Sequence, residues 1–176
     1  MEIEEQRLQS LRKWPEFFAG LCEGDLNNTE LLNELKGFDL IVYDSLAFCG
    51  PLIGELFNIQ RVEIFLAPPN HLLGLYHMIP MPVAYVPQLV RGHTDKMTFV
   101  ERVINLAAYL VGKLVLSLAY DRTMDNLKFK HNIKPERSFR EAVGDAELVL
   151  ITADFALEYP QPLLPGIRRL VLSCVD

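Results

Sequence analysis

The residues best suited to chemistry come directly after the first two apolar runs of the chain. Asp44 follows the continuous run Leu40–Tyr43, a pattern typical of a strand buried on both faces of a parallel sheet. A carboxylate at that place leaves the core and faces the crevice outside the carboxyl ends of the strands, where ligands bind in such sheets. Two interpretations of Asp44 stay open: it caps a turn or helix, or it orients a catalytic histidine.

A second group of candidates lies in and after the next apolar run. Glu63 departs from the apolar pattern of that run, and we expect it to face a helix end or solvent. His71 and His77 follow within residues 67–97, a long proline-rich loop of a kind that is usually functional or mobile. Each histidine is either a ligand-facing side chain or a solvated or hydrogen-bonded loop residue.

Alternating helical and strand patterns must position these residues. Short apolar runs predict strands at Phe38–Tyr43, Arg61–Leu66, Glu147–Thr152 and Arg168–Leu172. Periodicity and capping residues predict helices at 3–21, from Asn27-Asn28-Thr29 to Gly37, at Gly50–Phe57, from Thr98 to about Lys130, and after Ser138. Pro15 is expected to break or kink the first helix. The alternation predicts an α/β domain with a parallel sheet.

The helix after Thr98 is the most apolar part of the chain. Its stripe consists of Phe99, Val103, Leu106, Leu110 and Leu114. The stretch Leu106–Tyr120 is 15 residues long and carries Lys113 near its middle, so it is short and charged for a membrane span. The pattern favours a buried amphipathic helix, with contact to a membrane surface as the alternative.

Composition limits the class of protein further. The chain has 176 residues, of which 50% are hydrophobic, and a net charge of −6, so it can form one packed domain or part of a larger one. No basic cluster longer than two residues is present, which argues against nucleic-acid binding. The three cysteines, Cys22, Cys49 and Cys174, form no CxxC pair and predict no disulfide framework. Because the sequence stops directly after a strand-like run, we expect a fragment.

Several segments together carry a family resemblance. They are Phe38–Asp44, Gly54–Ile59, Ala84–Pro87 with Thr94–Val103, and Ala153–Pro165. In order and spacing they resemble the UDP-glucuronosyltransferase family over about residues 30–172. The sequence of Ile133–Ser138 is most similar to that of the ceramide galactosyltransferases.

The resemblance implies a partial Rossmann-like domain, the N-terminal half of a GT-B glycosyltransferase. Residues 1–176 would form part of the acceptor-binding domain, while the donor-binding domain and a membrane anchor would lie outside this chain. Family members reside in the endoplasmic reticulum membrane and face the lumen. The sequon Asn27-Asn28-Thr29 fits that location and makes Asn27 a candidate glycosylation site.

The resemblance also implies an inverting transfer of a hexosyl or glucuronosyl group from a UDP-sugar to a lipophilic acceptor hydroxyl, without a metal or other cofactor. Asp44 matches the aspartate that orients the catalytic histidine. All four histidines follow Asp44, so none matches the base, and we expect this fragment alone to be inactive. His71, Met78 and Tyr85 are candidate acceptor contacts, with ordinary loop packing as the alternative. The competing hypothesis is a non-catalytic protein that binds lipophilic molecules or pairs with full-length enzymes as a homo- or hetero-oligomer.

Overall fold

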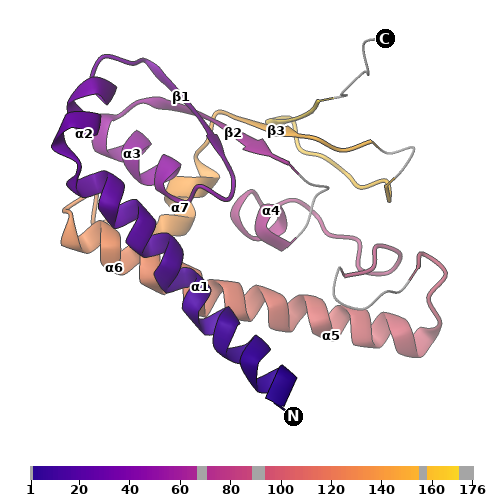
Figure 1. Cartoon of the computed structure of the whole chain (residues 1–176). Coiled ribbons are helices and arrows are strands. Elements are labelled where there is room, and N and C mark those ends of the chain that lie inside the picture. Colours follow the sequence, from indigo (N-terminus) through magenta and orange to yellow (C-terminus); the bar gives the residue numbers. More distant parts are fainter. Residues whose placement is uncertain (1, 67–70, 89–93, 155–157, 171–176) are drawn as a thin grey trace, which may run out of the picture.

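A four-stranded parallel sheet lies along one side of the computed structural model, which describes residues 2–66, 71–88, 94–154 and 158–170 (Figure 1). The strands are β1 Leu40–Asp44, β2 Gln60–Phe65, β3 Leu148–Ile151 and β4 Ile167–Arg169, and they lie side by side in chain order. In the register, Val42 pairs with Val62, and Val62 with Leu148. The predicted α/β fold, a partial Rossmann-like domain with a parallel sheet, is confirmed.

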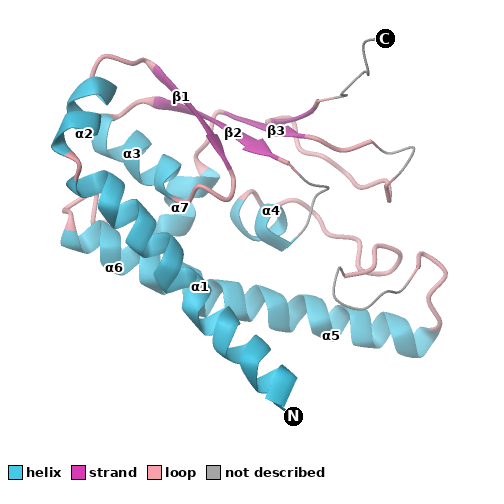
Figure 2. Cartoon of the chain, in the orientation of Figure 1, coloured by secondary structure: helices cyan, strands magenta, loops and turns pink. Residues whose placement is uncertain are grey.

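The helices all lie on one side of this sheet, with α3 packed directly on it (Figure 2). They are α1 Glu2–Asn27, α2 Thr29–Leu35, α3 Cys49–Phe57, α4 His71–Tyr76, α5 Phe99–Leu116, a π-helical turn η1 Ser117–Asp121, α6 Arg122–Lys130 and α7 Phe139–Gly144. On the covered face Tyr43 and Glu63 are buried, whereas Leu40 and Val42 on the opposite face are exposed. Within the described residues, no helix covers that opposite face (Figure 1).

Helix α3 packs closely on the sheet because two glycines face the strands. A Cβ atom on Gly50 would come within 2.3 Å of Cγ of Tyr43, and one on Gly54 within 2.3 Å of Cδ of Arg61. The buried Arg61 side chain donates hydrogen bonds to the carbonyl oxygens of Pro51 at 3.3 Å and Ala142 at 2.7 Å. Arg61 therefore ties β2 to both α3 and α7.

The core between the helices combines aromatic rings with paired charges. Phe48 lies 5.2 Å from Phe18 and 6.2 Å from Phe139, measured between ring centroids, so α1, α3 and α7 meet there. Nearby, the buried Lys128 ammonium on α6 bonds to the Glu55 carboxylate on α3. The guanidinium of Arg137 lies 3.1 Å from the same carboxylate, so the buried charges are paired, as burial requires.

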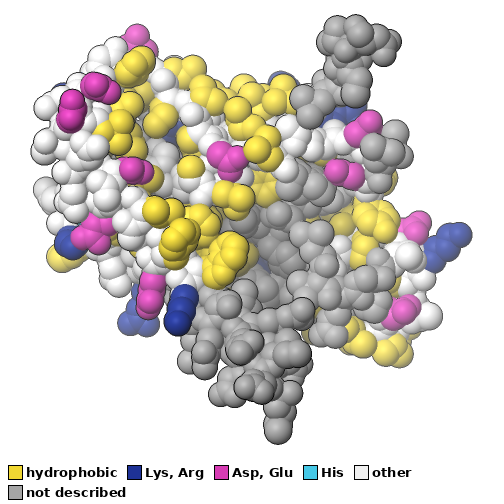
Figure 3. All heavy atoms as spheres, in the orientation of Figure 1, with side chains coloured by type: hydrophobic (Ala, Val, Ile, Leu, Met, Phe, Trp, Pro, Cys, Tyr) yellow, Lys and Arg dark blue, Asp and Glu magenta, His cyan; other side chains and the backbone are white. Residues whose placement is uncertain are grey.

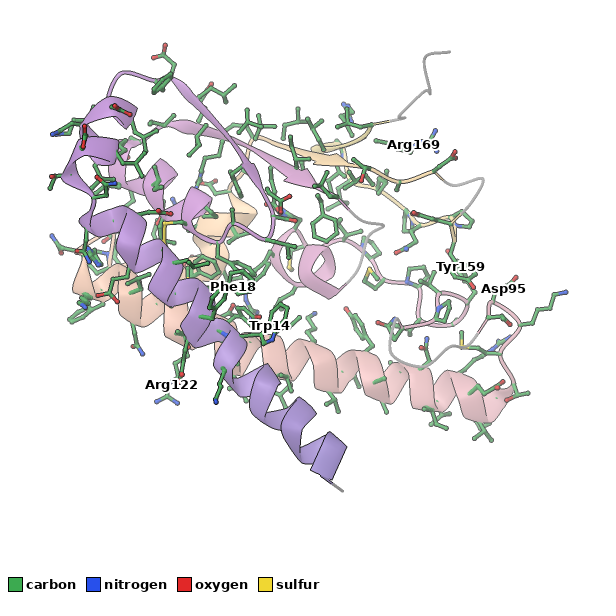
Figure 4. All side chains as sticks on the ribbon, in the orientation of Figure 1. Trp14, Phe18, Asp95, Arg122, Tyr159 and Arg169 are labelled. Carbon is green, nitrogen blue, oxygen red and sulfur yellow. A yellow bond between two sulfur atoms is a disulfide. The ribbon has the colours of Figure 1, made fainter. Side chains whose placement is uncertain are left out.

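The first helix is longer than the sequence predicts. α1 continues through Pro15 to Asn27, so the expected break is wrong. Proline removes one helical hydrogen bond, but the turns beyond it pack into the core through Phe18, Cys22 and Leu26, which compensates for that loss. Trp14 and Phe18 lie one turn apart on α1, with ring centroids 5.8 Å apart (Figure 4).

A disulfide also holds α1 in place. Cys22 on α1 and Cys49 at the start of α3 are bonded, with their Cα atoms 5.0 Å apart. The sequence predicts no disulfide framework and does not identify this single pair, because helix packing brings the two cysteines together across 27 residues and no spacing motif marks them. Cys174 lies outside the described residues.

Two further predictions need correction. The predicted loop at 67–97 contains a helix, α4, and the apolar stripe of α5 is exposed instead of buried. Phe99 is 80% exposed and Leu114 58%, while the opposite side of α5 packs inward through Asn105. By length and composition, Phe99–Lys130 could cross a membrane. Apolar side chains also gather on the visible face of α1 (Figure 3), where Trp14, Phe17 and Leu21 are exposed.

Candidate functional site

Asp44 ends β1 and caps the turn that follows it. One carboxylate oxygen, Oδ1, accepts a hydrogen bond from the Leu46 N–H at 2.7 Å, and the Asp44 carbonyl accepts one from Ala47 at 2.8 Å. The side chain is half-buried at the carboxyl end of the sheet. Among the described side chains, no histidine hydrogen-bonds to Asp44, so its role in orienting a catalytic base stays a prediction.

Beside it, on the covered face of the sheet, Glu63 forms a buried polar cluster with two neighbours. Its Oε2 lies 3.1 Å from the Tyr43 hydroxyl and 3.0 Å from Nε2 of His77. The side chains of Glu63 and His77 are only 4% and 6% exposed. Of the two expectations for Glu63, solvent exposure is wrong: the carboxylate meets a residue that directly follows the end of α4.

The protons in this cluster are placed by burial and charge. Burial, reinforced by the neighbouring Glu63 carboxylate, raises the pKa of the Tyr43 hydroxyl, so Tyr43 stays protonated and donates a hydrogen bond to Oε2 of Glu63. The same carboxylate favours the His77 tautomer with its proton on Nε2. His77 is thus the hydrogen-bonded loop histidine of the two alternatives, with its ring turned into the protein.

The segment after His77 carries the predicted acceptor contacts on its exposed side. Met78 is 76% exposed and has a left-handed backbone (φ 58°), and Tyr85 is 40% exposed. Met78 borders an open groove with Leu75 and Tyr76 of α4 and with Arg137, Arg140 and Gly144 at α7. Tyr85 is not part of that groove, so the structure does not bring the two residues into one pocket.

At its other end the segment is held by Asn105 of α5, which is fully buried. Its Nδ2 donates to the carbonyl oxygens of Val83 at 2.8 Å and Val86 at 2.9 Å, and its Oδ1 accepts from the N–H of Gln88 at 2.8 Å. The sequence analysis missed this role. The signal was present: Asn105 is a polar residue inside the most apolar helix, as Glu63 is inside an apolar strand.

The remaining candidates are placed less fully. His71 begins α4, but its side chain lies outside the described part of the structure, as does His93. Asn27 is exposed and ends α1, where a glycan would meet no core contact. Among the described residues, no group of three or more His, Cys, Asp or Glu side chains is arranged to hold a metal ion.

The four-stranded parallel sheet with its helices defines an α/β domain, and sequence comparison defines the family. The profile described as "UDP-glucoronosyl and UDP-glucosyl transferase" matches residues 2–172. The chain belongs to this family. No solved structure matches it significantly.

The chain is also similar to individual curated proteins. It is 33% identical to a UDP-glucuronosyltransferase of Pleuronectes platessa over 82% of this chain and 31% of that protein. It is 32% identical to UDP-glucuronosyltransferase 2C1 of Oryctolagus cuniculus, over 94% of this chain and 32% of that protein. A third relative is 2-hydroxyacylsphingosine 1-beta-galactosyltransferase of Rattus norvegicus, at 30% identity over 83% of this chain and 27% of that protein. The chain therefore spans about a third of the length of these relatives.

Proposed function

We propose that this chain is the acceptor-binding part of an inverting glycosyltransferase that moves a hexosyl or glucuronosyl group from a UDP-sugar to a lipophilic hydroxyl. Family membership carries the proposal. The arrangement at the carboxyl ends of β1 and β2 supports it, because Asp44 and the segment 77–88 follow neighbouring parallel strands. Met78 and Tyr85 offer exposed apolar and aromatic surface, which suits a lipophilic acceptor.

In this mechanism Asp44 acts on a histidine supplied from outside the chain. The histidine takes the proton of the acceptor hydroxyl while the hydroxyl oxygen attacks the anomeric carbon and UDP leaves. Asp44 accepts a hydrogen bond from the other imidazole nitrogen and stabilises the imidazolium that forms. In the turn after β1, the N–H of Leu46 donates a hydrogen bond to Oδ1 of Asp44, and this bond fixes the orientation of the carboxylate.

The test is Asp44→Asn in the complete enzyme that contains this segment. The amide cannot stabilise an imidazolium, so we expect turnover to fall by about 10³ to 10⁴-fold while the fold is kept. Glu147→Gln is the matched control, because Glu147 bonds to the N–H of Arg61 at the far end of β2. Turnover of the Asp44→Asn variant within a few-fold of the parent would remove Asp44 from the reaction.

We also propose that the acceptor contacts residues 77–88. A photoreactive phenol should label this segment, with Met78→Ala reducing the yield and the distant Leu21→Ala leaving it unchanged. Labelling that is confined to α1 or α5 would contradict the assignment.

For location, we propose the luminal side of the endoplasmic reticulum membrane. A structural disulfide such as Cys22–Cys49 persists in an oxidising compartment, and Asn27 is accessible for glycosylation. The exposed stripe of α5 fits a membrane surface. Treating the native protein with peptide N-glycosidase should lower its mass by one glycan, and an Asn27→Gln variant should show no such change.

One observation favours the non-catalytic alternative. Apolar residues are exposed along both α5 and the uncovered face of the sheet, as on proteins that bind a partner. If the chain serves as a partner subunit, it should form a stable homo- or hetero-oligomer with full-length family members and lower or raise their turnover. A chain that stays monomeric in the presence of full-length family members would contradict this alternative, and the acceptor-binding proposal would remain.

A further inference from the structure

Residues 77–88 are held at both ends by buried polar side chains from other elements. At the start, Glu63 of β2 binds His77. At the end, Asn105 of α5 binds three backbone groups between Val83 and Gln88. Buried carboxylate and amide groups are costly unless they are hydrogen-bonded, so each of these side chains is committed to its partners. We call Glu63 and Asn105 the two anchors of the segment.

The segment between the anchors has backbone structure of its own. The N–H of Val83 donates to the carbonyl oxygen of Met81 at 2.9 Å. The N–H groups of Tyr85 and Val86 donate to the carbonyl oxygen of Pro82 at 3.1 and 3.0 Å. Under the segment, Gly74 of α4 leaves room for the Met81 side chain, since a Cβ there would come within 2.7 Å of Met81 Cγ. The backbone is therefore bound while Met78 and Tyr85 stay exposed.

Met78 adds an independent observation. Its left-handed φ of 58° is uncommon for a residue with a Cβ atom, and it directly follows the anchored His77. A residue keeps such a conformation where the surrounding structure fixes it, and such positions cluster at ligand sites. The contact between His77 and Glu63 fixes the backbone on one side of Met78 and directs this flexible thioether outward.

We infer that Glu63 and Asn105 are positioning residues, which hold residues 77–88 in the binding conformation before a ligand arrives. The ligand would be a lipophilic hydroxyl compound bound by Met78 and Tyr85, and this part of the inference rests on the proposed function. The two anchors touch no ligand themselves. They raise affinity because a segment that is already ordered loses less conformational freedom when it binds.

The first measurement is amide hydrogen exchange on the full 176-residue chain. Glu63→Leu removes the acceptor for His77, and Asn105→Leu removes the three bonds at the other end. Each substitution should raise the exchange rates of the amides of Val83, Tyr85 and Val86 at least tenfold, with α3 and α7 unchanged. Glu147→Gln should leave these rates as in the parent.

A conservative variant separates positioning from general stability. Glu63→Gln keeps an oxygen that can accept from Tyr43 and His77, so its exchange rates should lie within about threefold of the parent. If Glu63→Leu does not fold, His77→Ala removes the same contact from the other side and takes its place in the comparison with Glu63→Gln, Asn105→Leu and the parent. Unchanged rates in residues 77–88 of Asn105→Leu, or equal increases in every element, would overturn it.

The second measurement is equilibrium binding of 1-naphthol, a lipophilic phenol used as the probe. Asn105→Leu should raise its dissociation constant about tenfold, and Glu63→Gln should leave it near the parent value. Failure of the parent to bind 1-naphthol would contradict the proposed acceptor site, while the exchange rates would still decide whether the anchors position the segment. If a variant exchanges the amides of residues 77–88 faster than the parent but binds 1-naphthol equally tightly, the inference that the anchors raise affinity is refuted.

Discussion

Removing the Cys22–Cys49 disulfide tests whether the covalent link between α1 and α3 stabilises the fold. The bond joins residues 27 apart in sequence. In the chain-entropy model, closing a loop of this length in the unfolded chain stabilises the folded state by about 3.5 kcal/mol at 25 °C. Because Cys22 and Cys49 are both buried in the main core cluster, the linked helices have little freedom to adjust after the bond is cut.

The assay is urea unfolding of the parent with and without reductant, followed by circular dichroism. For a slope of about 2 kcal/mol per molar urea, loss of the bond should lower the midpoint by about 1.5 to 2 M. The double variant Cys22→Ala with Cys49→Ala should unfold near the reduced parent and should not respond to reductant. Cys174→Ser is the control, and it should keep the full response.

Thiol counting gives the result that would refute this reasoning. Iodoacetamide applied to the unfolded, unreduced chain should label one cysteine out of three. Labelling of all three would show that the bond is not formed. One labelled cysteine together with an unchanged midpoint under reductant would show that the bond forms but adds no stability.

Three other perturbations test the core. Lys128→Met removes the ammonium from the buried Glu55 carboxylate and leaves Arg137 as its cationic partner, so it should cost at most about 3 to 5 kcal/mol of unfolding free energy, measured by urea titration; a loss below 1 kcal/mol would contradict the buried pairing. Gly50→Ala should cost about 2 to 3 kcal/mol because its Cβ meets the Tyr43 ring, whereas Gly24→Ala, which meets nothing within 4 Å, should be neutral or stabilising. Burial raises the pKa of Tyr43 in the folded state, so its contribution is complete below the unfolded pKa of about 10 and is lost as the pH rises above it. Tyr43→Phe should therefore make the fall in urea midpoint between pH 9 and 11.5 shallower, and an equal fall in both proteins would refute this.

Local patterns in the sequence were sufficient to predict the sheet and most helix ends. Short apolar runs mark β1, β2 and β3, although only the sheet face under the helices is buried and Leu40 and Val42 on the other face are exposed. β4, Ile167–Arg169, overlaps the predicted strand 168–172 only at its two arginines. The capping boxes Thr98/Glu101 and Ser138/Glu141 both form as predicted, since each depends only on residues three apart. Where structure follows from neighbours in sequence, the residues alone were enough.

Contacts between distant elements could not be predicted in this way. The disulfide, the Glu63–His77 bond and the contacts of Asn105 each join separate elements, and their distances depend on how the helices pack. The apolar stripe of α5 was assigned to the wrong side for the same reason. Periodicity identifies an apolar face, but it does not say whether that face meets the core of its own chain. The buried Asn105 on the other face was the residue that marked the inward side.

Helix α5 connects the candidate acceptor segment to an exposed apolar stripe. Its inward side carries Asn105, which binds the backbone of residues 83–88, and its outward side carries the stripe that includes Phe99 and Leu114. Since both sides belong to one helix, Asn105 keeps its bonds only while that helix stays docked. Any surface that covers the stripe, whether lipid or protein, and binds only the docked helix makes undocking rarer by mass action. Binding of a surface to the exposed stripe of α5 and the ordering of residues 83–88 are therefore thermodynamically linked. The link holds although that surface and the acceptor would occupy opposite sides of the helix.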